Sequence, residues 1–360
     1  MSSTRPLPRA AALLAGTSAL LTLSANAPAA ERVQVLASFS ILADMVEQVG
    51  GEHVEVTALV GPDSDAHVFT PRPTDARALA EADLVVFNGL QFEGWMARLT
   101  DAGDYTGPTV VATDGIEDAL AADDDAHGHD DRAHDAAGPD QEHGAHDSAP
   151  ETGGDSHDDH AHGGLDPHAW QDLGLGPLYV TNIRDGLISA DPDHEEAYRA
   201  RAARYLEEIA ALDAELHALL DSLPESTSVI TGHDSFGHFA RAYGVTFLSP
   251  VGLSSEAEPS AANMARLIDV IRERHVGALF HENMTSPAMI DQLAEETGLP
   301  VAGTLYADAL AAEGEASSWL GMMRHNARLL HDALGGADDG RDEPGHEDED
   351  AHDAAAGHGH

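Results

Sequence analysis

The sequence predicts an α/β protein with two lobes, in which parallel sheets are flanked by helices and one long, rigid helix joins the lobes. Short apolar runs typical of strands alternate with helix-like patterns, which is the order of a parallel sheet covered on both faces. The alternation occurs twice, on either side of one long helical pattern. A chain of 360 residues, 42% of them hydrophobic, is large enough to build a core in each lobe.

The N-terminal lobe is assigned to residues 30–190 and the C-terminal lobe to residues 223–335. In the first, we expect strands at residues 33–37, 54–60, 84–87 and 109–111, with a helix over 41–49. In the second, we expect strands at residues 228–231, 245–248, 278–280 and 301–305. The runs are short and rich in Val, Ile and Leu, as strands buried on both faces are.

Residues 191–222 are predicted to form the helix between the lobes. Asp191 is a plausible N-cap, and Pro192 suits the first helical position. The apolar positions that recur at helical spacing are Tyr198, Tyr205, Ile209, Leu212, Leu216 and Leu219. The helix would span about 40 Å, enough to run along both lobes. A rigid connector of this kind predicts limited hinge motion.

Residues 1–29 are expected to be a secretory signal peptide. Arg5 and Arg9 precede an apolar run over residues 10–23, and Ala27 and Ala29 form a small-x-small cleavage site. The alternative is an N-terminal membrane anchor, although the run is short for a bilayer span. The signal peptide predicts a periplasmic location.

Composition narrows the chemistry. The chain has no cysteine, so it forms no disulfide and any metal site must use nitrogen and oxygen donors. It also has no cysteine to carry a lipid anchor. The formal net charge of −46 argues against binding to nucleic acid or to anionic membrane surfaces.

Two low-complexity segments are predicted to be disordered because they cannot bury enough apolar surface to offset their ordering entropy. One is a His/Asp-rich loop over residues 123–164 inside the N-terminal lobe, and the other is an acidic, His-containing tail over residues 336–360. The loop is either a solvated insertion or a set of weak zinc ligands, and we favour the second interpretation. Its histidines are His127, His129, His134, His143, His146, His157, His160 and His162.

Candidate metal donors follow the carboxyl ends of three expected strands, where open α/β sheets bind ligands. They are His67, His233 and Asp308, while His168 lies where ordered sequence resumes after the His-rich loop. A lone histidine after a strand is more often a loop residue with one hydrogen bond. His238, five residues after His233, is expected to be structural. Since each lobe supplies two donors, the metal site is expected in the cleft between them.

Several motifs resemble one protein family. Besides the His67 loop, they are Asn88-Gly89-Leu90 with Phe92-Glu93-Gly94-Trp95, Asp166-Pro167-His168-Ala169-Trp170, His233-Asp234-Ser235-Phe236-Gly237, Gly303-Thr304-Leu305-Tyr306-Ala307-Asp308 and Met322-Met323-Arg324-His325-Asn326. In this order, over residues 33–330, they resemble the ZnuA-type, zinc-specific solute-binding proteins of bacterial ABC transporters. This group belongs to a wider zinc- and manganese-binding cluster.

The resemblance implies that His67, His168, His233 and Asp308 coordinate the metal. In manganese-binding relatives a glutamate usually stands at the position of His233, and three imidazoles with one carboxylate suit zinc. The His-rich loop is also typical of zinc-specific members. One departure is Ala66, since such members often carry a glutamate there; Asp308 is therefore the expected fourth ligand, with water as the alternative.

The predicted function is capture of Zn²⁺ as a transported ligand, without catalysis, and delivery to an ABC permease by a monomer. The His-rich loop is also a candidate contact for a periplasmic zinc metallochaperone. The alternatives are a manganese- or iron-binding protein of the same kind and a periplasmic zinc buffer or adhesin. A zinc hydrolase is disfavoured because four protein donors leave no open position for water.

Overall fold

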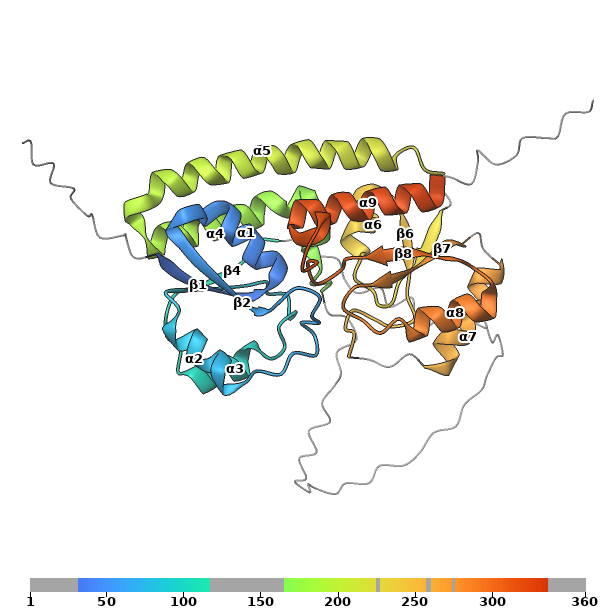
Figure 1. Ribbon diagram of the computed structural model, residues 1–360, viewed down its shortest axis with the longest axis horizontal. Helices are drawn as coiled ribbons and strands as arrows, with labels where there is room; N and C mark the ends of the chain where they lie inside the picture. Colours follow the sequence, from blue (N-terminus) through green and yellow to red (C-terminus); the bar gives the residue numbers. More distant parts are fainter. Residues whose placement is uncertain (1–31, 117–164, 225–226, 257–259, 274–275, 336–360) are drawn as a thin grey trace, which may run out of the picture. The chain divides into compact units, whose positions relative to one another are not determined.

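The computed structural model describes residues 32–116, 165–224, 227–256, 260–273 and 276–335. The signal peptide, the His-rich loop with its histidines, and the acidic tail lie outside these ranges. The described chain forms two four-stranded parallel sheets, which confirms the predicted fold class (Figure 1). The strand orders are β2 (Val54–Val60), β1 (Val33–Phe39), β3 (Leu84–Phe87), β4 (Thr109–Val111) and β6 (Thr246–Leu248), β5 (Ser228–Ile230), β7 (Val276–Glu282), β8 (Val301–Leu305).

The inner strands β1 and β5 are the most deeply buried. All but one residue of β1 and all of β5 are buried, as expected for inner strands covered on both faces. Parallel pairing sets Val35 of β1 beside Val56 of β2, and it sets all the carboxyl ends of one sheet along the same edge. Loops leaving that edge therefore converge.

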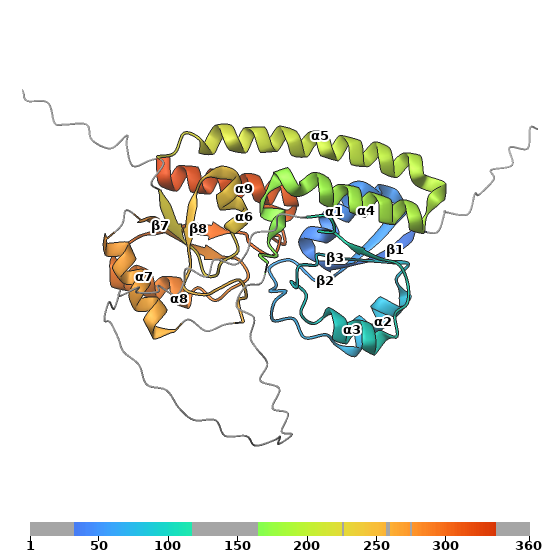
Figure 2. The ribbon, with the colours of Figure 1, turned by 180° about the vertical axis from the view of Figure 1, so that it is seen from behind.

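Helices cover both faces of the first sheet. α1 (Ser40–Gly50) and α4 (Gly176–Ala190) lie on one face, and α2 (Pro73–Glu81) and α3 (Met96–Gly103) lie on the other (Figures 1 and 2). Short 3₁₀ turns at η1 (Gly51–His53), η3 (Ala169–Gln171) and η4 (Leu173–Leu175) connect these elements. The last two follow directly on His168.

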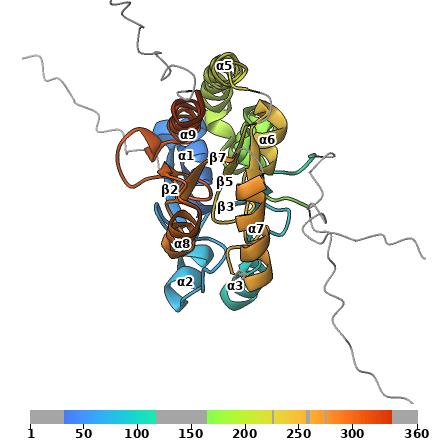
Figure 3. The same ribbon diagram turned by 90° about the vertical axis from the view of Figure 1, so that its right-hand side faces the viewer.

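The second sheet is covered in the same way. α6 (Gly237–Tyr243) and α9 (Trp319–Gly335) lie above the strands in Figure 3, and α7 (Ala261–Glu273) and α8 (Ala288–Thr297) lie below them. The 3₁₀ turn η6 (Glu315–Ser317) leads into α9. No helix in the described part of the chain is long and apolar enough to cross a membrane.

The long helix α5 (Glu195–Leu220) packs against α1 and α4 and, further along, against α9 (Figure 1). Asp191 and Pro192 stand at the predicted N-cap and first helical positions, but residues 192–194 form a 3₁₀ turn, η5 (Pro192–His194), and Asp191 makes no side-chain cap. The Asp191 carboxylate instead accepts hydrogen bonds from Tyr198 Oη (2.7 Å) and His194 Nδ1 (2.6 Å).

The lobes share one apolar core through two tryptophans. Trp170 and Trp319 are fully buried, and the indole N–H of Trp319 donates to the carbonyl of Trp170 (2.9 Å). The indole N–H of Trp170 in turn donates to the carbonyl of Ala307 (2.9 Å), just before Asp308. Close packing of this kind resists large hinge motion. A separate, smaller apolar cluster lies under α7 and α8.

Candidate metal centre

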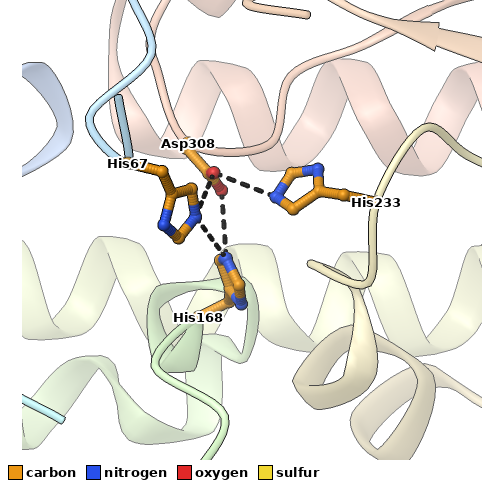
Figure 4. A group of neighbouring side chains, drawn as sticks. All are labelled: His67, His168, His233 and Asp308. Atoms are coloured by element: carbon orange, nitrogen blue, oxygen red, sulfur yellow. Dashed lines mark hydrogen bonds and ion pairs between the residues drawn. The ribbon is translucent and has the colours of Figure 1, made fainter. Parts of the chain in front are cut away.

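Four side chains from separate parts of the chain point toward one another (Figure 4). His67 follows β2, His168 precedes η3, His233 follows β5 and Asp308 follows β8. One donor atom from each lies within 4.8 Å of the others, so the structure brings together all four residues named from the sequence. No other group of His, Cys, Asp or Glu in the described chain meets that criterion.

The donor separations match those of a coordination sphere. Asp308 Oδ2 lies 3.2 Å from His67 Nε2 and 3.1 Å from His233 Nε2, and Asp308 Oδ1 lies 3.5 Å from His168 Nε2. The two Nε2 atoms of His67 and His168 are 3.4 Å apart. Donors placed tetrahedrally at about 2.0–2.1 Å from a zinc ion are about 3.3 Å from each other. The four groups therefore fit one first-row divalent metal.

One oxygen of the Asp308 carboxylate, Oδ1, has no hydrogen-bond partner in the described chain, whereas Oδ2 faces the imidazoles of His67 and His233. Its side chain is fully buried, and Oδ1 accepts no hydrogen bond. An unpaired buried carboxylate oxygen is costly and therefore rare in folded proteins. A bound metal would give Oδ1 a partner, which supports Asp308 over water as the fourth donor.

Two further carboxylates orient the imidazoles. The Nδ1 atom of His168 lies 2.7 Å from Asp166 Oδ1, and the Nδ1 atom of His233 lies 2.7 Å from Glu282 Oε2. Each carboxylate accepts the Nδ1–H and also accepts the backbone N–H of the same histidine. The Nε2 lone pairs are then directed at the centre, as in carboxylate–histidine–metal arrangements.

The loop that carries His67 is fixed by neighbours of the first lobe. The indole N–H of Trp95 donates to the carbonyl of Ala66 (2.8 Å), and the His67 ring packs edge-on against Phe92. Asp65 accepts the backbone N–H of His67 (2.8 Å). The imidazole is only 6% exposed, although its loop lies at the surface. His67 is thus held ready to bind.

Charges within the site compete with burial. Burial disfavours a charged His168, but the carboxylates of Asp308 and Asp166 outweigh this and raise its pKa to about 9. In the same way, Glu282 and Asp308 overcome burial and raise the pKa of His233 well above its usual value. The two imidazoles hold the pKa of Asp308 well below its usual range, against the effect of burial. Protons therefore occupy the metal-free site and must leave when a metal binds.

Sequence reasoning did not identify the roles of Asp166 and Glu282. Asp166 was noted only as part of a motif, and Glu282 ends β7 at the same edge of the sheet as His233. Its position at a strand's carboxyl end was the available signal. His238, expected to be structural, contacts the backbone carbonyl of Asp166 (3.2 Å) and lies outside the four-residue group.

Comparison with known proteins identifies the class. The family model described as zinc-uptake complex component A, periplasmic, matches residues 35–333. The chain is 30% identical over 335 residues to the manganese-binding lipoprotein MntA of Bacillus subtilis, covering 90% of this chain and 98% of MntA. It is 28% identical to the iron-binding protein YfeA of Yersinia pestis, covering 86% and 90%.

One solved structure has a similar fold across both lobes. The periplasmic zinc binding protein TroA from Treponema pallidum superimposes with a TM-score of 0.70 at 25% identity, over 84% of this chain and 99% of that one. Fold and site together define an extracytoplasmic, metal-binding solute-binding protein of an ABC uptake system, which is not an enzyme. The chain belongs to the family of the zinc-uptake component A proteins.

Proposed function

We propose that the chain captures a divalent transition metal in the periplasm with His67, His168, His233 and Asp308 and delivers it to an ABC permease. The observation that carries the proposal is the convergence of three Nε2 atoms and one buried carboxylate. With four protein donors, the metal is enclosed as cargo and keeps no open position for catalysis. Names of family relatives, such as the manganese ABC transporter substrate-binding lipoprotein PsaA of Streptococcus pneumoniae, support delivery to a transporter.

Zinc is the cargo that the donor set favours. Three borderline nitrogen donors and one oxygen donor suit zinc, whereas harder, carboxylate-rich sites suit manganese. The second candidate is manganese or iron, and the curated relatives favour it, because MntA is named for manganese and YfeA for iron. TroA, by contrast, is titled a zinc binding protein. The choice therefore depends on measurement.

Competition titration of the full chain with zinc and manganese tests whether His233 contributes to metal selectivity. Zinc outcompetes manganese at most nitrogen and oxygen sites, so its affinity alone decides little. The informative value is the ratio of zinc affinity to manganese affinity, compared between the wild type and His233→Glu. This substitution replaces an imidazole by a hard oxygen donor. We expect the ratio to fall in a variant whose circular dichroism is unchanged. An unchanged ratio would mean that His233 is not a ligand.

Growth of cells lacking this chain tests delivery. Under the zinc proposal the deletion strain fails under zinc limitation and is restored by the wild-type chain. A defect under manganese or iron limitation alone would favour the second candidate. No defect under any of these limitations would favour a periplasmic zinc buffer or adhesin.

The domain boundaries and the low-complexity segments keep their proposed roles. We propose a signal peptide over 1–29, lobes over 30–190 and 223–335 joined by 191–222, a weak zinc-binding segment over 123–164, and a tail over 336–360. The chain is proposed to act as a monomer, and the His-rich segment is proposed to meet a periplasmic metallochaperone. These roles rest on the residue patterns of the sequence.

A further inference from the structure

One carboxylate beside the site joins the two lobes. Asp65 Oδ1 accepts the backbone N–H of His67 (2.8 Å), while Asp65 Oδ2 accepts a short hydrogen bond from Ser255 Oγ (2.6 Å). Ser255 lies in the second lobe, between β6 and α7. The group that fixes a metal ligand of one lobe is therefore also bound to the other lobe.

A second aspartate in the same loop makes a parallel set of bonds. Asp63 Oδ1 accepts from Asn283 Nδ2 (3.0 Å), and Asp63 Oδ2 accepts from the backbone N–H of Ala312 (3.1 Å). Its own N–H donates to the carbonyl of Leu310 (2.9 Å). Asp63 has a φ of +51°, a left-handed conformation that aspartate tolerates better than most residues. The loop thus adopts a less common backbone conformation in which both carboxylate oxygens reach the second lobe.

Two partners of Asp63 lie close in sequence to residues of the metal site. Asn283 follows Glu282, which holds His233, and Leu310 lies two residues after Asp308. Ser255 and His233 line the same cavity of about 720 Å³ beside the site. Separation of the Asp63–Asp65 loop from the second lobe would therefore move His67 away from His233 and Asp308 together.

We propose that Asp63 and Asp65 are positioning residues that retain the bound metal. Their hydrogen bonds to Asn283 and Ser255 hold the His67 loop closed over the site, and release requires these bonds to break. The inference rests on the proposed function, since it assigns the residues that govern release from that same site. The bonds are expected to act on dissociation more than on association, because differences in affinity lie mostly in the dissociation rate.

Metal dissociation from the full chain, followed by stopped flow into excess chelator, tests the proposal with zinc as the probe. Ser255→Ala and Asn283→Ala each remove a partner in the second lobe without touching His67. We expect each to raise the dissociation rate about tenfold, the effect of losing one hydrogen bond to a charged group, with little change in association rate. Ser255→Thr, which keeps the hydroxyl, should restore the wild-type rate.

Ser254→Ala is the matched control. Its Oγ accepts only the backbone N–H of Glu256 (3.3 Å) among the contacts of the described chain, so its dissociation rate should equal that of wild type. Wild-type dissociation rates in both Ser255→Ala and Asn283→Ala would overturn the inference, as would equal acceleration in Ser254→Ala. Failure of the proposed function would be recognised separately, since the wild-type chain would then hold no tight metal at all.

Discussion

Glu282→Gln removes a charge from the partner of His233 while keeping its shape. Glu282 offers one oxygen to the Nδ1–H of His233 (2.7 Å) and the other to its backbone N–H (3.2 Å). A glutamine has one oxygen and one NH₂ group, so one of these N–H donors would face another donor. The side chain is fully buried, and water cannot easily replace the lost acceptor.

The expected loss of zinc affinity is roughly 10–100-fold, about 1.4–2.7 kcal/mol, as for other carboxylates that orient a ligating imidazole. A second effect opposes it at neutral pH. Of the carboxylates that raise the pKa of His233 against burial, Glu282 has the largest effect. Removal of its charge therefore lowers the pKa of His233, so that protons compete less with the metal. The deficit should therefore be larger at pH 9 than at pH 7.

The assay is competition with a chromophoric chelator at both pH values. Glu295→Gln removes the same charge from an exposed position of α8 and serves as the control. Thermal melts of the metal-free proteins check folding. An affinity within threefold of wild type at pH 9, in a folded Glu282→Gln variant, would refute the role assigned to this carboxylate.

Three further predictions concern the same site. Alanine at His67, His168 or His233 should weaken zinc binding by more than the roughly 10–100-fold expected when a carboxylate behind a ligating imidazole is lost. Asp308→Ala should weaken zinc binding less than the histidine substitutions, because water replaces a carboxylate more easily than an imidazole. Competition titration checks this order, and a larger loss at Asp308 would contradict it. Because the pKa of His168 is raised to about 9, affinity should already fall as pH decreases from 9 to 7, by up to roughly tenfold per unit for each proton displaced; a flat profile would contradict proton displacement. Deletion of residues 123–162 should remove weak zinc sites and leave one tight site in calorimetry, and loss of the tight site would contradict the assignment to the four clustered side chains.

The fold class was predictable because burial on both faces leaves a local signal. β1 and β5 are short runs rich in apolar residues that alternate with helical patterns along the chain, and this order indicates parallel sheets. The topological rule then located His67, His233 and Asp308 at strand ends. At the start of the long helix, Asp191 and Pro192 occupy the predicted positions, but the Asp191 carboxylate pairs with Tyr198 and His194 and makes no side-chain cap.

Other features of the site had no local signal. His168 follows no strand, and its place rested on family resemblance; in the structure its loop is held by Asn88, whose Nδ2 donates to the carbonyl of Pro167 (2.9 Å). Glu282 resembles any carboxylate at the end of a strand until the fold sets it behind His233. The bond between Asp65 and Ser255 joins residues 190 positions apart, so no spacing rule could have found it.

X-ray absorption spectroscopy of the full chain loaded with one equivalent of zinc tests the central claim most directly. A site made by His67, His168, His233 and Asp308 predicts four nitrogen or oxygen neighbours at about 2.0–2.2 Å, with the outer-shell scattering of three imidazoles. The imidazole signal should fall by one ring in His233→Ala. A zinc environment with fewer than three imidazoles, or one unchanged by that substitution, would contradict the four-ligand site.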